Sequence, residues 1–131
     1  MPTKEEEFKH RLVAVLEDLE ENGKQDPEAI WLIGSLAHGI VEKTGNKTWR
    51  QFKDSMSQEV YSTLLGDFEK VGNRQYREGD HRKAYAMQAL GISLVATTQE
   101  SREVKAGDAL LNRFIEMAIG VYRKSQEGKP N

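Results

Sequence analysis

The sequence of 131 residues predicts an all-α fold, a compact bundle of about five antiparallel helices with one short connecting helix. Three observations lead to this prediction. Apolar residues recur at intervals of three and four, as on one face of an amphipathic helix, and no stretch alternates as a half-buried strand does. The prolines stand at positions 2, 27 and 130, the two ends and one expected helix start. The segments between the periodic stretches are short, which favours antiparallel neighbours.

The first two helices are expected over residues 3–22 and 27–43. The first ends at Asn22-Gly23, because glycine readily takes the left-handed conformation that follows a helix. The second begins after Asp26, a favourable N-cap, with proline at the first helical position. Gly34, in its middle, predicts that a neighbouring helix packs closely there.

A short helix over residues 48–53 is expected next, followed by three longer helices over 57–78, 80–97 and 101–125. The segments 55–58 and 97–100 match the capping-box pattern. The last helix carries two apolar stripes, which predict either burial on two sides in a central position or a seam shared with a second copy. The stripes are Leu110, Phe114, Met117 and Val121, and Leu111, Ile115, Ala118 and Tyr122. Residues 1–125 then form a single helical domain, and residues 126–131 form a polar tail.

Composition narrows the function classes. The absence of cysteine excludes disulfides, thiolate metal sites and cysteine nucleophiles. The acidic N-terminus lacks the apolar core of a signal peptide, and the longest apolar run, near Ile30, is too short to span a bilayer, so we expect a cytoplasmic protein without membrane contact. The net charge is −2, but residues 1–28 carry four basic and nine acidic side chains and the remainder is basic. We interpret these charges mainly as solvated helix faces, with attraction between the two regions as an alternative.

Residues 68–90 contain a Gly79-Asp80 turn between two amphipathic stretches, with small Gly72 and Ala84 at the expected contact. Together with Phe68 and Val71, these residues resemble one copy of a tetratricopeptide repeat over about residues 65–98. The segment departs from that pattern where Gln75 and Gln88 replace aromatic residues and Ala96 replaces the final proline. The resemblance implies peptide or protein binding on a concave face, with these exposed candidates: Asn73, Gln75, Arg77 and Lys83. The alternative is an ordinary helical hairpin, since no second copy is found and a lone repeat cannot bury its own faces.

Basic residues gather around the same turn and raise the alternative of a nucleic-acid-binding regulator. They are Lys70, Arg74, Arg77, Arg82 and Lys83. Neighbouring acidic residues dilute this cluster and the chain as a whole is not basic, so a nucleic-acid partner is the less favoured interpretation.

No catalytic, cofactor-binding or metal-binding residue is expected. The three histidines do not form a metal motif, and no phosphate-binding loop or nucleophile elbow is present. His38 is interpreted as a partly buried, hydrogen-bonded histidine, and it would be the first candidate if the chain were a small enzyme.

Trp49 lies in the short connecting helix. We interpret it as closing one end of the bundle, with an exposed anchor for a partner as the alternative. The surplus of apolar stripes over what one bundle of this size must bury predicts a non-enzymatic protein–protein interaction or scaffold module that forms a homodimer.

Overall fold

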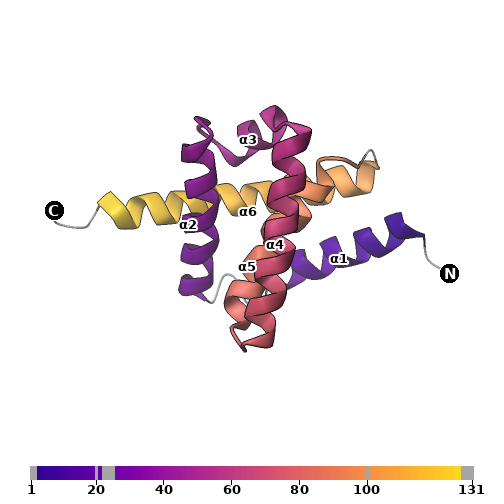
Figure 1. The fold of residues 1–131 in the computed structure, drawn as a ribbon, viewed down its shortest axis with the longest axis horizontal. Coiled ribbons are helices and arrows are strands. Elements are labelled where there is room, and N and C mark those ends of the chain that lie inside the picture. Colours follow the sequence, from indigo (N-terminus) through magenta and orange to yellow (C-terminus); the bar gives the residue numbers. More distant parts are fainter. Residues whose placement is uncertain (1–2, 20, 22–25, 100, 128–131) are drawn as a thin grey trace.

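The structure, a computed structural model, describes residues 3–19, 21, 26–99 and 101–127. The described part contains six helices and no strand, which confirms the all-α prediction (Figure 1). They are α1 (Lys4–Asp18), α2 (Pro27–Lys43), α3 (Trp49–Ser55), α4 (Gln58–Arg77), α5 (His81–Ala96) and α6 (Arg102–Glu127). The predicted end of the first helix at Asn22-Gly23 lies outside the described residues. Helix α6 includes the first two residues of the predicted polar tail.

Short polar side chains define where the helices begin. Thr3 and Glu6 form a reciprocal capping box at α1, and the Asp26 carboxylate accepts from the backbone amides of Glu28 and Ala29 at α2. Thr48 caps α3 and Asp80 caps α5 in the same way. Each cap satisfies amide groups that have no partner inside the first helical turn.

Two predicted capping boxes are wrong in their placement. Ser55 is the last residue of α3, and Ser57 is the N-cap of α4, where its hydroxyl accepts from the Val60 amide at 3.2 Å. Thr97 ends α5 rather than starting α6, because its hydroxyl donates to the Ser93 carbonyl one turn earlier at 3.1 Å. The last residue of that predicted box, Glu100, lies outside the described residues.

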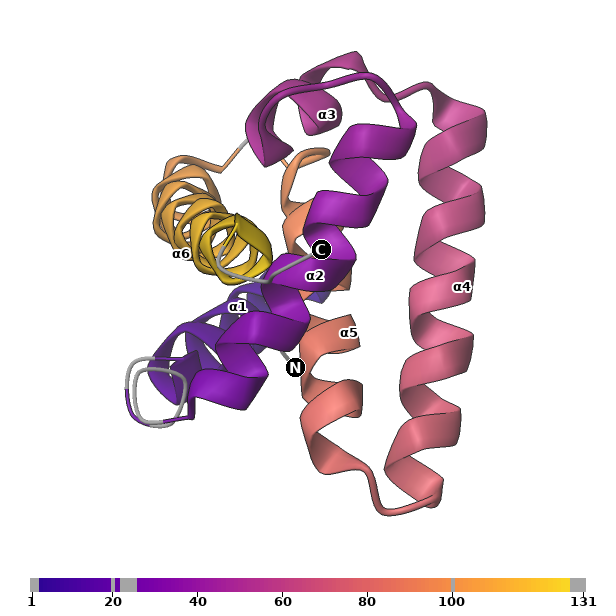
Figure 2. The same cartoon turned by 90° about the vertical axis from the view of Figure 1, so that its left-hand side faces the viewer.

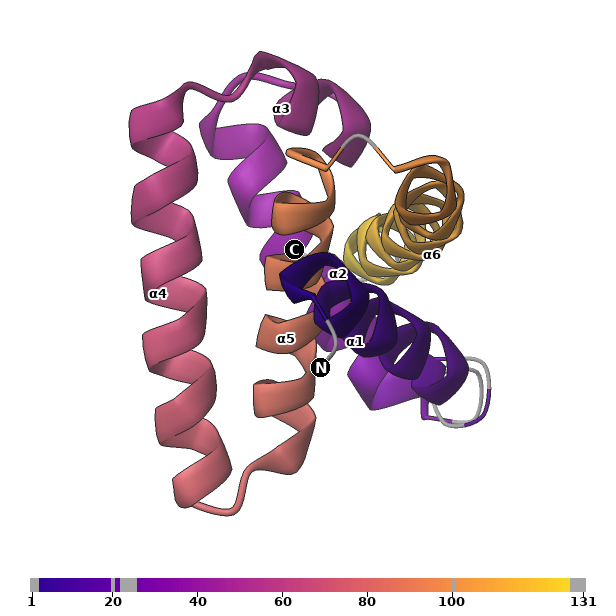
Figure 3. The same cartoon turned by 90° about the vertical axis from the view of Figure 1, so that its right-hand side faces the viewer.

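Helix α5 lies between α4 on one side and α1 and α6 on the other, while α2 crosses α6 (Figures 2 and 3). The crossing departs from the simple antiparallel bundle that the short connections predict. Gly34 permits it, as expected: a Cβ atom at this position would lie 2.0 Å from the Ala118 backbone oxygen. The backbones of α2 and α6 therefore touch at a point where no side chain fits between them.

The hairpin of α4 and α5 forms as the small residues predict. Gly79 makes the turn with φ +86°, and a Cβ atom on Gly72 would lie 3.2 Å from Met87 Cβ. Helix α4 packs chiefly on α5 and buries only Phe68, so it forms the outer edge of the molecule.

The prediction that the last helix is buried on two sides is wrong. Nine of the 16 residues of α5 are buried, compared with five of the 26 in α6, so α5 is the central helix. Leu111, Ile115 and Ala118 are buried in the core, but Leu110 and Met117 of the other stripe are exposed. One copy of the chain buries the first of these stripes and covers the other only in part, at Phe114.

Candidate functional site

The hairpin candidates do not gather into one site. Asn73, Arg77 and Lys83 are exposed, whereas Gln75 is partly buried. Two residues along a helix correspond to a rotation of about 200°, so Gln75 faces away from Asn73. Asn73 lines a groove of mixed polar and apolar side chains between α4, α5 and the start of α1, together with Arg11 and Glu69. The hairpin therefore presents these side chains in different directions.

The basic residues of the hairpin are divided as well. Lys70, Arg74 and Arg77 share one face of α4, as their spacing predicts. Arg82 turns toward the start of α2, where its guanidinium donates to Asp26 Oδ2 at 2.9 Å and to Glu28 Oε2 at 2.6 Å. The acidic N-terminal region therefore neutralises one member of the predicted nucleic-acid cluster.

Trp49 is fully buried, so the alternative of an exposed partner anchor is wrong. Trp49 is therefore not a partner-binding candidate. Its ring lies 5.2 Å from that of Phe52, and its indole N–H donates to Ser93 Oγ at 2.9 Å. Trp49 and Phe52 together anchor α3 on the core.

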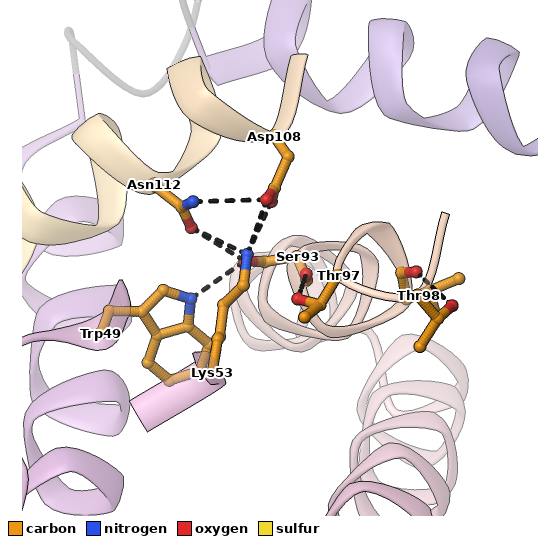
Figure 4. A network of polar contacts seen from close by, with 8 residues as sticks. Trp49, Lys53, Ser93, Thr97, Thr98, Asp108 and Asn112 are labelled. Carbon is orange, nitrogen blue, oxygen red and sulfur yellow. Dashed lines mark hydrogen bonds and ion pairs between the residues drawn. The ribbon is translucent and has the colours of Figure 1, made fainter. Parts of the chain in front are cut away.

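Lys53, which the sequence did not single out, lies at the centre of a buried polar cluster (Figure 4). Its side chain is 3% exposed, and its ammonium group donates to Asp108 Oδ1 at 2.7 Å, to Asn112 Oδ1 at 3.0 Å and to Ser93 Oγ at 3.1 Å. A second contact reaches Asp108 Oδ2 at 2.9 Å. The cluster therefore joins α3 to both α5 and α6.

The cluster offers the Lys53 ammonium group three different oxygen-bearing partners. Burial lowers the pKa of Lys53, and the hydrogen bond and negative charge of Asp108 oppose that effect. An ammonium group has three protons, and here all of them point to oxygen acceptors. A protonated Lys53 is therefore fully hydrogen-bonded within the chain.

Signals for this cluster exist in the sequence but are weak. Trp49 and Lys53 are four residues apart, as are Asp108 and Asn112, and each pair therefore shares a helix face. Ser93 interrupts an otherwise apolar stretch of α5. The contacts of Lys53 with Ser93 and Asn112 join residues that are 40 and 59 positions apart, and local sequence patterns do not reveal such contacts.

His38 is the partly buried, hydrogen-bonded histidine that the sequence predicts. Its Nδ1 accepts a hydrogen bond from Arg123 Nε at 3.1 Å, and its ring packs on Tyr122 with centroids 5.1 Å apart. Across the described residues, no group of three or more His, Asp or Glu side chains is arranged to hold a metal ion. His38 therefore joins α2 to α6.

The strongest candidate for a functional surface lies where α1 packs obliquely on α6 (Figures 2 and 3). We define the α1–α6 face by its apolar members. They are Val13, Leu16, Leu110, Phe114 and Met117, which line the groove between the helices, and Val121, which follows Met117 by about one turn on α6. Val13 and Leu110 are 50% and 54% exposed, and Met117 and Val121 are 44% and 41% exposed. Leu16 and Phe114 form the floor of a shallow groove between the two helices. This face contains the stripe of α6 that the core covers only in part.

Three comparisons, with models of known protein families, with curated proteins and with solved structures, find no match to this chain. The tetratricopeptide-like segment therefore stays a prediction. Within the described ranges, each helix is too short or too polar to cross a lipid bilayer.

Proposed function

We propose that this chain is a non-enzymatic protein–protein interaction module that self-associates through the α1–α6 face. The observation that carries the proposal is the exposure of large apolar side chains there. Among the described residues, seven large apolar side chains are exposed, and four of them, Val13, Leu110, Met117 and Val121, belong to this face. Large exposed apolar patches are typical of interaction sites.

The other exposed apolar residues do not form a comparable surface. Val60 and Tyr76 are 16 residues apart on α4, which places them about 24 Å from each other along the helix. The Trp31 ring packs on Tyr122, and its indole N–H donates to Ser125 Oγ at 3.0 Å. The α1–α6 face is therefore the best supported docking surface.

A second copy of the chain would offer the same apolar face as its partner. An isologous dimer would use the face twice and cover it on both copies.

The face is also held in place before any partner arrives. Tyr85 of α5 donates its hydroxyl to the Val15 carbonyl of α1 at 2.8 Å, and Lys9 of α1 pairs with Glu103 of α6. A Cβ atom on Gly107 would lie 2.8 Å from Leu12 Cδ2, so α1 and α6 are in close contact. A preformed surface loses little conformational entropy on binding.

The nucleic-acid alternative receives less support, because Arg82 is engaged by Asp26 and Glu28. The test of self-association is sedimentation equilibrium over the micromolar range. We expect a mass of twice 14.9 kDa for the wild type. A chain that stays monomeric at the highest concentration contradicts the proposal.

Substitutions test whether the dimer uses the proposed face. Leu110→Gln and Met117→Gln remove apolar area without adding charge, and each side chain occurs twice in the dimer, so we expect about tenfold weaker association for each variant. Val60→Gln is the matched control, because Val60 is similarly exposed on α4. If Val60→Gln weakens the dimer as much as the other two, the α1–α6 face is not the interface.

A further inference from the structure

Charged side chains follow the two sides of the α1–α6 face in matching rows. Glu6 and Glu17 are exposed on α1, and Arg102, Arg113 and Lys124 are exposed on α6. Successive members of each row are 11 residues apart. Eleven residues are close to three helical turns, so each row runs straight along its helix. The face therefore has an acidic border on α1 and a basic border on α6.

The two rows also begin at the same end of the face. Helices α1 and α6 run in the same direction (Figure 1). Lys9 pairs with Glu103 near the start of both helices. Further along both helices, Leu12 and Leu16 pack on Gly107. Glu17 and Arg113 line the same groove. Glu6 lies before this groove on α1, as Arg102 lies before it on α6.

Two copies can meet through this face with two-fold symmetry in two ways. A symmetry axis across the helices places α1 on α1 and α6 on α6, so that acidic borders oppose each other and basic borders oppose each other. A symmetry axis along the helices places α1 of one copy on α6 of the other. Only the second arrangement joins opposite charges at both borders.

We propose that the occupant of the face is a second copy of this chain whose α1 lies on α6 of the first, with the two-fold axis running along these helices. In this arrangement Glu17 meets Arg113 of the other copy twice, and Glu6 meets Arg102 twice. The apolar side chains of the face are enclosed between the charged borders. This inference rests on the proposed self-association and adds the orientation of the two copies.

Charge reversal with mixing tests the orientation. In Glu17→Arg and in Arg113→Glu, each homodimer contains like charges at two opposed positions, so we expect each to associate roughly tenfold or more weakly than the wild type. In an equimolar mixture, the heterodimer restores an opposite-charge pair at both positions. We expect it to associate about as tightly as the wild type. Neither Glu17 nor Arg113 forms an ion pair inside the described chain, so both variants should fold, which circular dichroism verifies.

Cysteine cross-linking gives an independent measurement, because the chain contains no cysteine of its own. With a short thiol-reactive linker, we expect Glu17→Cys mixed with Arg113→Cys to give the cross-linked dimer, and Glu17→Cys alone to give little. Cross-linking of Glu17→Cys to itself, or failure of the charge-reversed variants to combine, overturns the proposed orientation. A wild type that is monomeric instead overturns the proposed function, so the two failures are distinguishable.

Discussion

Gly34 and Lys53 connect helices through opposite means. Gly34 lets two backbones touch because it has no side chain, whereas Lys53 reaches across a polar interface with a long one. Both positions join α6 to the rest of the chain, and α6 carries half of the α1–α6 face. The stability of that face therefore depends on two residues that do not belong to it.

Replacement of Gly34 by alanine should loosen the crossing of α2 and α6. The added Cβ atom would lie 2.0 Å from the Ala118 backbone oxygen, so the helices must separate, and we expect a loss of about 3 kcal/mol in the free energy of unfolding. Gly39→Ala is the matched control in the same helix, because nothing lies within 4 Å of its added Cβ atom. There, better helix propensity should add up to about 1 kcal/mol. Urea unfolding of both variants measures the difference, and equal effects would contradict the crossing.

Replacement of Lys53 by methionine should destabilise the chain by about 3 kcal/mol, because the Asp108 carboxylate loses its buried partner. In the double variant Lys53→Met, Asp108→Leu, no unpaired charge is left, and much of the lost stability should return. Lys105→Met is the control, since Lys105 and Lys53 line one surface pocket but Lys105 is itself exposed. Urea unfolding of the three variants tests the cluster. A double variant less stable than Lys53→Met would show that the ion pair itself is not the source of the loss.

Among the elements, helix starts are the features best predicted from the sequence. Asp26 and Asp80 are recognisable because a cap is a local interaction over two or three residues, whereas the choice between Ser55 and Ser57 at α4 was predicted wrongly. Burial of whole stripes is different. The two stripes of α6 have similar apolar composition, so the sequence alone does not determine which one faces the core. The Lys53 cluster is not predicted, for a different reason. It brings together α3, α5 and α6 through residues that are 40 and 55 positions apart in the sequence.

The contact between α1 and α5 has a testable pH dependence through Tyr85. Burial, with a contribution from the Asp18 charge, raises the pKa of the Tyr85 hydroxyl far above its usual value of 10.0. Below pH 10 the hydroxyl is protonated in both folded and unfolded chains. Above pH 10 the unfolded chain releases this proton while the folded chain retains it, so stability must fall as pH rises.

Tyr85→Phe should therefore change two quantities. At neutral pH the variant loses the hydrogen bond to Val15 and about 1 kcal/mol of stability. Above pH 10 its stability should fall less steeply than that of the wild type. Guanidinium unfolding at several alkaline pH values provides both measurements. Parallel pH profiles for the two proteins would show that Tyr85 is not the group responsible.

At the scale of the whole molecule, the proposed dimer combines an apolar centre with charged borders, and salt separates their contributions. Salt at about 1 M shortens the screening length to roughly 3 Å, which weakens exposed charge pairs but not apolar contact. Wild-type association should therefore weaken modestly and persist. The homodimers of Glu17→Arg and Arg113→Glu should instead become tighter, because the same screening relieves repulsion between like charges. Sedimentation equilibrium at low and high salt measures this reversal of sign. If added salt changes the strength of association in the same direction for all three proteins, the acidic and basic borders do not face each other in the dimer. Only residues that face each other across the two copies make the wild type and the charge-reversed variants respond to salt in opposite directions.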